Sequence, residues 1–203
     1  NTFNQLIDIR GFGLTDGYKN IAITVNGRRL NNIDSVPQKL SDLGINNIDR
    51  IEITKGSGSV VHGDGATGGS IQIYTRDTTE TNLKVTVGNY GINTGSFTTG
   101  LSKDKFMLSA SGSHYQQDGF SDKGPDGIKD RASSKNYSAK LRYFPTESSE
   151  LFIEKDYAHV NVRYPNALTL STFLADPDSN FKTTVGLTNY SFETSNTNNL
   201  SLG

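Results

Sequence analysis

The second half of the chain, from Asn82 onward, is a series of long segments in which apolar and polar side chains alternate. Alternation with a period of two is typical of β-strands that have one apolar and one polar face. We predict strands at 82–88, 93–102, 105–117, 135–144, 150–163 and 183–192. This pattern favours a large antiparallel sheet over any helical fold.

The connections between these segments differ in length. Residues 103–104 and 145–149 are short links, whereas 119–134 and 164–180 are long, polar and rich in Gly, Pro and Asp. Short turns at one rim and long loops at the other are typical of an outer-membrane β-barrel. A soluble β-sandwich with one solvated face gives the same alternation, so the strand pattern alone leaves both folds open.

Composition narrows the class of protein. Hydrophobic residues make up 33% of the chain and the mean hydropathy is −0.51. No run in the sequence reaches the roughly 18 apolar residues of a membrane-spanning helix. Barrel strands remain compatible with such values, because they alternate. The net charge of −1 argues against nucleic acid as a partner. The absence of Cys excludes disulfides and thiolate chemistry.

The first part of the chain has shorter strand patterns with irregular connections. Alternating stretches predict four strands, at 7–10, 21–25, 50–54 and 70–75. The second stretch runs into Asn26-Gly27, a dipeptide that favours a type I′ hairpin turn, and a short helix is expected at 37–43. These elements predict a small α+β unit.

Residues 48–76 form the most specific motif of the chain. Two strand patterns are joined by a glycine-rich bend that includes Gly-Asp-Gly-Ala-Thr-Gly at 63–68. This hexapeptide fits the dinucleotide-binding pattern literally, but that pattern needs a following helix, and here a strand pattern follows. The glycines therefore indicate tight backbone packing instead of a nucleotide site.

The 48–76 run resembles the plug signature of TonB-dependent outer-membrane receptors, which include siderophore and vitamin B12 receptors. Ile-Arg-Gly-Phe-Gly at 9–13 and the hairpin at 23–30 resemble two earlier plug motifs in the right order. The chain departs from the usual pattern at four positions where the family commonly has Asp, Arg, Pro and Tyr: Asn26, Lys55, Ser57 and His62. The glycines of the bend remain.

The resemblance implies an α+β plug domain followed by antiparallel transmembrane β-barrel strands, as a fragment of a plugged barrel of about 22 strands. Residues 1–79 are then the C-terminal part of the plug and 80–203 about the first six barrel strands, with the junction near 76–80. The chain starts inside a pattern, so a preceding segment is expected to contact TonB.

The resemblance also implies the function. Receptors of this family import a scarce, bulky nutrient, such as a siderophore–iron complex, cobalamin, haem or a glycan, across the outer membrane of a Gram-negative bacterium. Their partners are TonB, the nutrient or metal chelate, and outer-membrane lipid. A soluble secreted β-rich binding module and a structural outer-membrane protein without transport remain the alternatives.

Site residues carry over from the plug motifs. Two plug apices would bind the substrate through Asn1, Asn4, Gln5, Arg29, Asn31, Asn32, Asp34, Ser35 and Gln38. Plug–barrel contacts are expected at Arg10, Arg50 and Glu52. Structural glycines are expected at Gly11, Gly27, Gly56, Gly63, Gly68 and Gly69.

No catalytic, cofactor or metal site is expected. Asp122, Asp126 and Asp130 share a loop, but their spacing fails the pattern of a calcium-binding EF-hand loop. The three histidines, at 62, 114 and 159, lack the spacing of metal ligands or of a catalytic triad. The sequence therefore predicts a protein that is not an enzyme.

Overall fold

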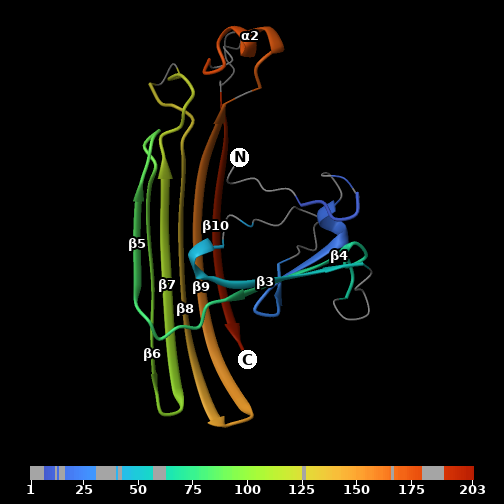
Figure 1. The fold of residues 1–203 in the computed structure, drawn as a ribbon, viewed down its shortest axis with the longest axis vertical. Helices are drawn as coiled ribbons and strands as arrows, with labels where there is room; N and C mark the ends of the chain where they lie inside the picture. Colours follow the sequence, from blue (N-terminus) through green and yellow to red (C-terminus); the bar gives the residue numbers. More distant parts are fainter. Residues whose placement is uncertain are drawn as a thin grey trace. The chain divides into compact units, whose positions relative to one another are not determined.

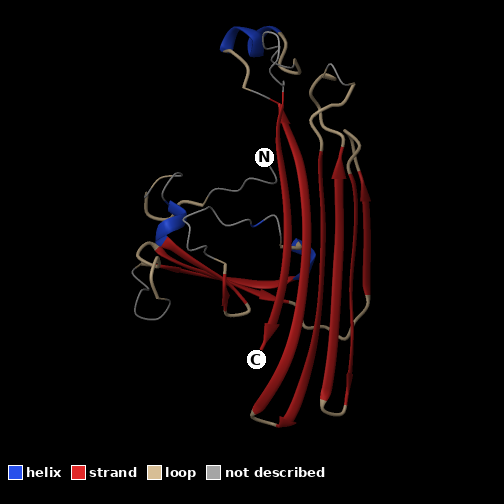
Figure 2. Cartoon of the chain, turned by 180° about the vertical axis from the view of Figure 1, so that it is seen from behind, coloured by secondary structure: helices blue, strands red, loops and turns tan. Residues whose placement is uncertain are grey.

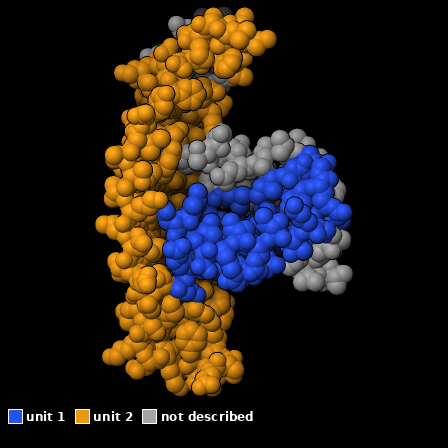
Figure 3. Space-filling model, in the orientation of Figure 1, with its two compact units in different colours: residues 1–77 blue, residues 78–203 orange. Residues whose placement is uncertain are grey.

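The computed structural model describes residues 7–11, 13, 17–30, 40, 43–56, 63–124, 127–165, 167–179 and 190–203. The chain divides into two compact units, residues 1–77 and 78–203 (Figure 3). Each unit is built on its own β-sheet.

The first unit has a four-stranded mixed sheet with the order β2-β1-β4-β3. Strand β1 is parallel to β4, and the other two pairs are antiparallel. The strands predicted at 21–25, 50–54 and 70–75 are confirmed. The elements of this unit are η1 (Gly17–Asn20), β1 (Ile21–Val25), β2 (Arg28–Arg29), η3 (Ile45–Asn47), β3 (Ile48–Lys55) and β4 (Gly69–Thr75).

Two other predictions for this unit have different outcomes. The strand predicted at 7–10 is wrong: Arg10 and Gly11 form a turn with φ of 68° and 75°. Left-handed backbone cannot continue a strand, although Ile7 and Ile9 alternate as strand residues do. The helix predicted at 37–43 falls outside the described residues, except for Leu40 and Leu43.

Alternating isoleucines and valine build the core of the first unit. The register pairs Ile23 with Ile71 and Val25 with Ile73, so these side chains share one face of the sheet. Each is at most 8% exposed. Burial of such a side chain contributes about 1.5–3 kcal/mol. Residues packed against this cluster include Ile7, Ile9, Leu30, Leu40, Leu43 and Ile48.

The second unit is a six-stranded antiparallel meander, in which each strand pairs with its neighbours in sequence (Figures 1 and 2). Two-residue turns join β6 to β7 and β8 to β9, close to the short links predicted at 103–104 and 145–149, of which the second is shorter than predicted. Strands β5 and β10 are its edges, so the sheet is open. The strands are β5 (Asn82–Val87), β6 (Asn93–Lys103), β7 (Phe106–Gln117), β8 (Ala132–Thr146), β9 (Ser149–Pro165) and β10 (Tyr190–Leu202).

The last strand lies later in the chain than predicted. The expected strand at 183–192 overlaps β10 (Tyr190–Leu202) only at its start, and residues 183–189 lie outside the described residues. Strand β10 is rich in Ser, Thr and Asn and has little apolar alternation. It is a strand because it pairs residue by residue with the 17-residue β9.

A short helix, α2 (Leu170–Ala175), lies in the connection between β9 and β10, where only a loop is predicted. Its N-terminal cap is Thr169, whose hydroxyl accepts a hydrogen bond from the Thr172 amide at 3.2 Å. Among the described residues, no helix is both long and apolar enough to cross a membrane.

Side chains of the six-stranded sheet separate into two faces. The apolar face is defined by rows of paired residues such as Leu101, Leu108, Leu141, Ile153 and Leu202. The polar face carries mainly Ser, Thr, Asn and charged residues between them. Leu108 and Leu141 are each 42% exposed and Leu202 is 70% exposed. A sheet that exposes its apolar face suits a lipid environment better than water.

Candidate functional site

The hairpin between β1 and β2 is fixed by Asn26. Asn26 and Gly27 have φ of 50° and 81°, the conformation of a type I′ turn. The Asn26 side chain also reaches the end of β4: Nδ2 donates to Thr75 Oγ1 at 2.7 Å, and Oδ1 accepts from the Thr75 amide at 3.0 Å. The Asn26 amide donates to the Ile73 carbonyl at 2.9 Å. The turn is therefore anchored to the centre of the sheet.

Arg29 joins the hairpin to the glycine-rich bend. Its guanidinium donates a hydrogen bond to the backbone carbonyl of Asp64. A Cβ atom at Gly65 would lie 3.0 Å from Arg29 Nη2 and 3.0 Å from the Lys19 carbonyl, and one at Gly63 would lie 3.6 Å from Nη1. The bend has room for the Arg29 guanidinium because Gly63 and Gly65 have no side chains.

Strand β3 carries a cluster of charged side chains on its exposed surface. Arg50 Nε donates to Glu52 Oε1 at 2.8 Å and its guanidinium lies 3.7 Å from Asp49. The guanidinium carbon stacks 3.8 Å from the centroid of the Tyr74 ring on the paired strand. The hydrogen bond from Arg50 lowers the pKa of Glu52 and, in turn, raises the pKa of Arg50.

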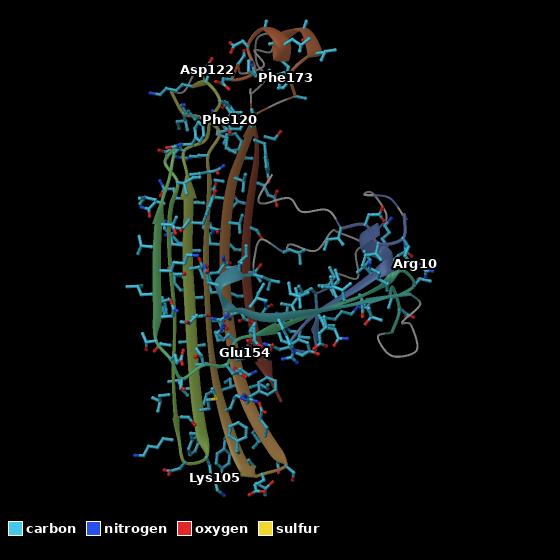
Figure 4. The ribbon with its side chains drawn as sticks, viewed as in Figure 1. Arg10, Lys105, Phe120, Asp122, Glu154 and Phe173 are labelled. Carbon is cyan, nitrogen blue, oxygen red and sulfur yellow. The ribbon has the colours of Figure 1, made fainter. Side chains whose placement is uncertain are left out.

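The long-loop end of the six-stranded sheet has its own polar cluster (Figure 4, beside Phe120 and Asp122). The buried Asp130 carboxylate accepts hydrogen bonds from the Ser121 amide, at 2.8 Å, and from the Ser121 hydroxyl. The Tyr190 hydroxyl donates to the Asp122 carbonyl at 3.0 Å. The Arg163 guanidinium lies 3.6 Å from the Tyr190 ring centroid. These hydrogen bonds therefore hold the β7–β8 loop together and attach it to the start of β10.

The first unit is similar to a known protein family. Residues 1–70 match the model of the TonB-dependent Receptor Plug Domain. Residues 1–70 therefore belong to the plug-domain family of TonB-dependent receptors. No curated protein sequence matches it significantly.

Solved receptor structures show the same fold. "Copper transporter OprC" aligns with 82% of the chain at a TM-score of 0.61 and 18% identity. The ferripyoverdine receptor of the outer membrane of Pseudomonas aeruginosa aligns with 81% at 0.59 and 15% identity. The ferric-catecholate import receptor Fiu from E. coli K12 aligns with 81% at 0.58 and 17% identity. The chain covers 27%, 23% and 24% of those three chains, so it spans about a quarter of their length.

Most residues predicted to bind substrate fall outside the described residues. The exception is Arg29, which contacts the glycine-rich bend, and its ligand-binding role stays a prediction. The predicted positions outside the described residues are Asn1, Asn4, Gln5, Asn31, Asn32, Asp34, Ser35 and Gln38.

The three residues predicted at the plug–barrel contact separate into two places. Arg50 and Glu52 pair with each other on β3, whereas Arg10 lies in the exposed turn that precedes η1. Among the described residues no ion pair joins Arg10 to Glu52. Contact of these residues with the barrel remains a prediction.

The predicted structural glycines occupy turns and close approaches. Gly69 is the tightest, because a Cβ atom there would lie 2.3 Å from the Thr54 carbonyl oxygen of the paired strand. Gly68 donates its amide to the Asn20 carbonyl at 2.8 Å and accepts from the Gly56 amide at 3.2 Å. Gly11, Gly27, Gly56 and Gly63 have positive φ.

Sequence reasoning missed three contacts: Asn26 with Thr75, Arg50 with Tyr74, and Tyr190 with the β7–β8 loop. The Asn-Gly dipeptide marked the turn, but nothing local in the sequence marks these partners. Asp126, of the acidic loop cluster, lies outside the described residues. The described residues contain no group of His, Cys, Asp or Glu that could hold a metal ion.

Proposed function

We propose that this chain is part of a receptor that imports a scarce, bulky nutrient across the outer membrane of a Gram-negative bacterium, driven by TonB. The observation that carries the proposal is the order of its two units: a plug-domain match at 1–70, followed by an antiparallel sheet whose apolar face is exposed. A transporter needs no catalytic residues, and the proposal includes none.

The substrate class follows from what similar receptors are named for. Their names include a copper transporter, a ferric-catecholate import receptor and a ferripyoverdine receptor. We therefore propose a metal chelate, chiefly a siderophore–iron complex, as the preferred substrate of this receptor. Cobalamin, haem and glycans are the other candidates. The polar side chains predicted at the plug apices suit hydrogen bonding to such a ligand.

The plug is proposed to bind the inner barrel wall through Arg10, Arg50 and Glu52. Exposed arginines bind carboxylates in bidentate geometry. Arg50 is already paired with Glu52 in the plug, so Arg10 is the better candidate for a carboxylate of the wall. TonB is the proposed source of energy.

Nutrient-limited growth tests the proposal. Deletion of the gene encoding the receptor should abolish growth on one chelated nutrient as sole source, and deletion of tonB should abolish growth on the same nutrient. Complementation of each deletion should restore growth. Growth that depends on the receptor but not on TonB would indicate passage through a pore without active transport.

Two further measurements separate the proposal from a soluble binding module. The receptor should fractionate with outer membranes, and its migration on gels should change on heating, as expected of a stable β-barrel. Recovery of the protein in a soluble secreted fraction would contradict the proposal.

A further inference from the structure

The apolar face of the six-stranded sheet has an unbalanced charge. Strands β5–β10 contain four carboxylates, and all four lie on the polar face: Glu150, Glu154, Asp156 and Glu193. Among the described strand residues, the apolar face carries cations but no carboxylate. Its cationic and imidazole side chains are Lys103, Lys135, Lys155, Arg163, His114 and His159.

Two pairs of stacked aromatic rings lie on this face. Phe106 and Tyr143, whose ring centroids are 4.8 Å apart, lie near the short turns, at the end marked by Lys105 in Figure 4. Tyr137 and Tyr157, 6.2 Å apart, lie toward the long loops. The two tyrosines of β8, Tyr137 and Tyr143, are six positions apart, which corresponds to about 20 Å along a strand. Aromatic girdles flank the apolar band of an outer-membrane barrel in this way.

Three of the basic side chains form one row directly beyond the second aromatic pair. The register aligns His114 with Lys135, Lys135 with His159, and His159 with Asn196 across four adjacent strands. The His159 ring is held by a 2.7 Å hydrogen bond between its Nδ1 and Asn196 Oδ1. Lys135 is exposed, and among the described residues no ion pair involves it.

Strand tilt explains why this row has basic side chains on β7, β8 and β9 but an apolar side chain, Val85, on β5. On β5 the exposed Leu83, Val85 and Val87 lie level with the Tyr137 row and the two rows beyond it. Apolar residues on β10, Leu200 and Leu202, lie nearer the short turns. The band thus crosses the strands obliquely, as expected for barrel strands tilted by about 35–45°. At equal register, Lys135 and His159 therefore lie farther toward the long-loop side than Val85.

We propose that His114, Lys135 and His159 form a binding site for the phosphate-bearing headgroup of a lipid in the outer leaflet. The inference rests on the outer-membrane location proposed above, because long loops lie on the extracellular side of such barrels. Acyl chains of the lipid lie along the apolar band, and the headgroup meets a row of donors that no carboxylate on this face neutralises. Basic clusters beside an apolar surface recognise anionic lipids by this combination.

Lys155 adds to the site from within the band. It aligns with Ala139 and Leu200 and lies two residues before Tyr157 on the same face. A lysine among apolar residues extends its charged end toward the nearest polar layer. The nearest polar layer toward the long loops is the row of Lys135 and His159.

Native mass spectrometry of the purified full-length receptor tests the site with two probes, lipid A and its dephosphorylated form, which share acyl chains and differ in phosphate. Lipid A should bind at least about fivefold more tightly than the dephosphorylated form, which corresponds to one lysine near an anionic surface. The K135Q/H159Q double variant should lose this preference. Lys135→Arg should keep it, because the charge remains.

Lys84→Gln is the matched control, because Lys84 is exposed but lies on the polar face, paired with Ser96. It should leave lipid A binding unchanged. Equal binding of both probes by the wild type, or an unchanged preference in K135Q/H159Q, would overturn the site. Heat-dependent gel migration of each variant verifies its folding.

Failure of the proposed function gives a different result. A receptor recovered away from outer membranes would remove both proposals at once. A receptor that fractionates with outer membranes and supports TonB-dependent growth, while K135Q/H159Q binds lipid A as the wild type does, would remove the headgroup site alone.

Discussion

The side-chain amide of Asn26 bridges to Thr75 by two hydrogen bonds, at 2.7 Å to its hydroxyl and at 3.0 Å from its backbone amide. The two residues are 49 positions apart, and the contact ties the hairpin to the last residue of the central strand β4. Asn26 also adopts a positive φ, which Asn, Asp and Gly tolerate best.

Substitutions at Asn26 should separate its hydrogen bonding to Thr75 from its positive φ in the turn. Asn26→Asp should resemble the wild type, because a carboxylate accepts from the Thr75 amide and the Thr75 hydroxyl can rotate to donate. Asn26→Gly keeps the turn but loses both bonds, and should destabilise the hairpin by about 1–2 kcal/mol. Hydrogen exchange at the Thr75 amide measures the difference. Equal protection in the Asp and Gly variants would show that the bridge contributes nothing.

Glu52 should titrate below the ordinary glutamate range. The hydrogen bond from Arg50 lowers its pKa, so the favourable interaction is present above the ordinary pKa of about 4.3 and is lost as pH falls through the lowered value. Arg50→Gln should return the pKa of Glu52 toward the ordinary range, as followed by NMR of the side-chain carboxyl carbon. Asp49→Asn is the control and should leave the pKa of Glu52 low, because Asp49 pairs with Arg50 and not with Glu52.

Strands with clear alternation could be predicted from the sequence. Ile21, Ile23 and Val25 define β1 because each second side chain is apolar, and Phe106 and Leu108 do the same for β7. The alternation failed for β10, where Asn, Ser and Thr occupy both faces and only pairing with β9 defines the strand. It also failed at 7–10, because backbone φ is not visible in a pattern of side-chain polarity.

The candidate site was predictable only in its local parts. The Asn26-Gly27 turn follows from residue types that tolerate positive φ. The partners of Asn26 and Arg29, Thr75 and the Asp64 carbonyl, lie 49 and 35 residues away, and only the parallel pairing of β1 with β4 brings them close. Such contacts depend on the whole sheet and leave no local signal.

Gly69 should not tolerate a side chain. Gly69→Ala places a Cβ atom against the Thr54 carbonyl and requires a φ near 153°, so β3 and β4 must separate. We expect a loss of more than about 1 kcal/mol, measured as increased hydrogen exchange along β4. Gly95→Ala in β6 is the matched control, since no atom lies within 4 Å of a Cβ there, and a change of under about 0.5 kcal/mol is expected. Similar effects of the two substitutions would contradict the steric argument.

The two faces of β8 should respond differently to a new charge. Leu141→Lys places a cation in the exposed apolar row and should reduce insertion by about 2–4 kcal/mol if the row lies near the bilayer midplane. Ser138→Lys, on the polar face of the same strand, should have little effect. The fraction that shows heat-dependent gel migration after refolding into vesicles measures both. Tolerance of Leu141→Lys would argue that this face meets water or protein.

The Tyr190 hydroxyl should control order at the long-loop end of the sheet. It donates to the carbonyls of Asp122 and Ile128, at 3.0 and 3.4 Å, and links the first residue of β10 to the β7–β8 loop. Tyr190→Phe removes this link but keeps the ring beside Arg163, so loop protection should fall by about 1 kcal/mol while strand pairing persists. Hydrogen exchange over residues 119–131 measures the loop, and the amides of β9 serve as the internal reference. Loss of protection in β9 as well would show that Tyr190 supports the strand pair through its hydroxyl, not the loop alone.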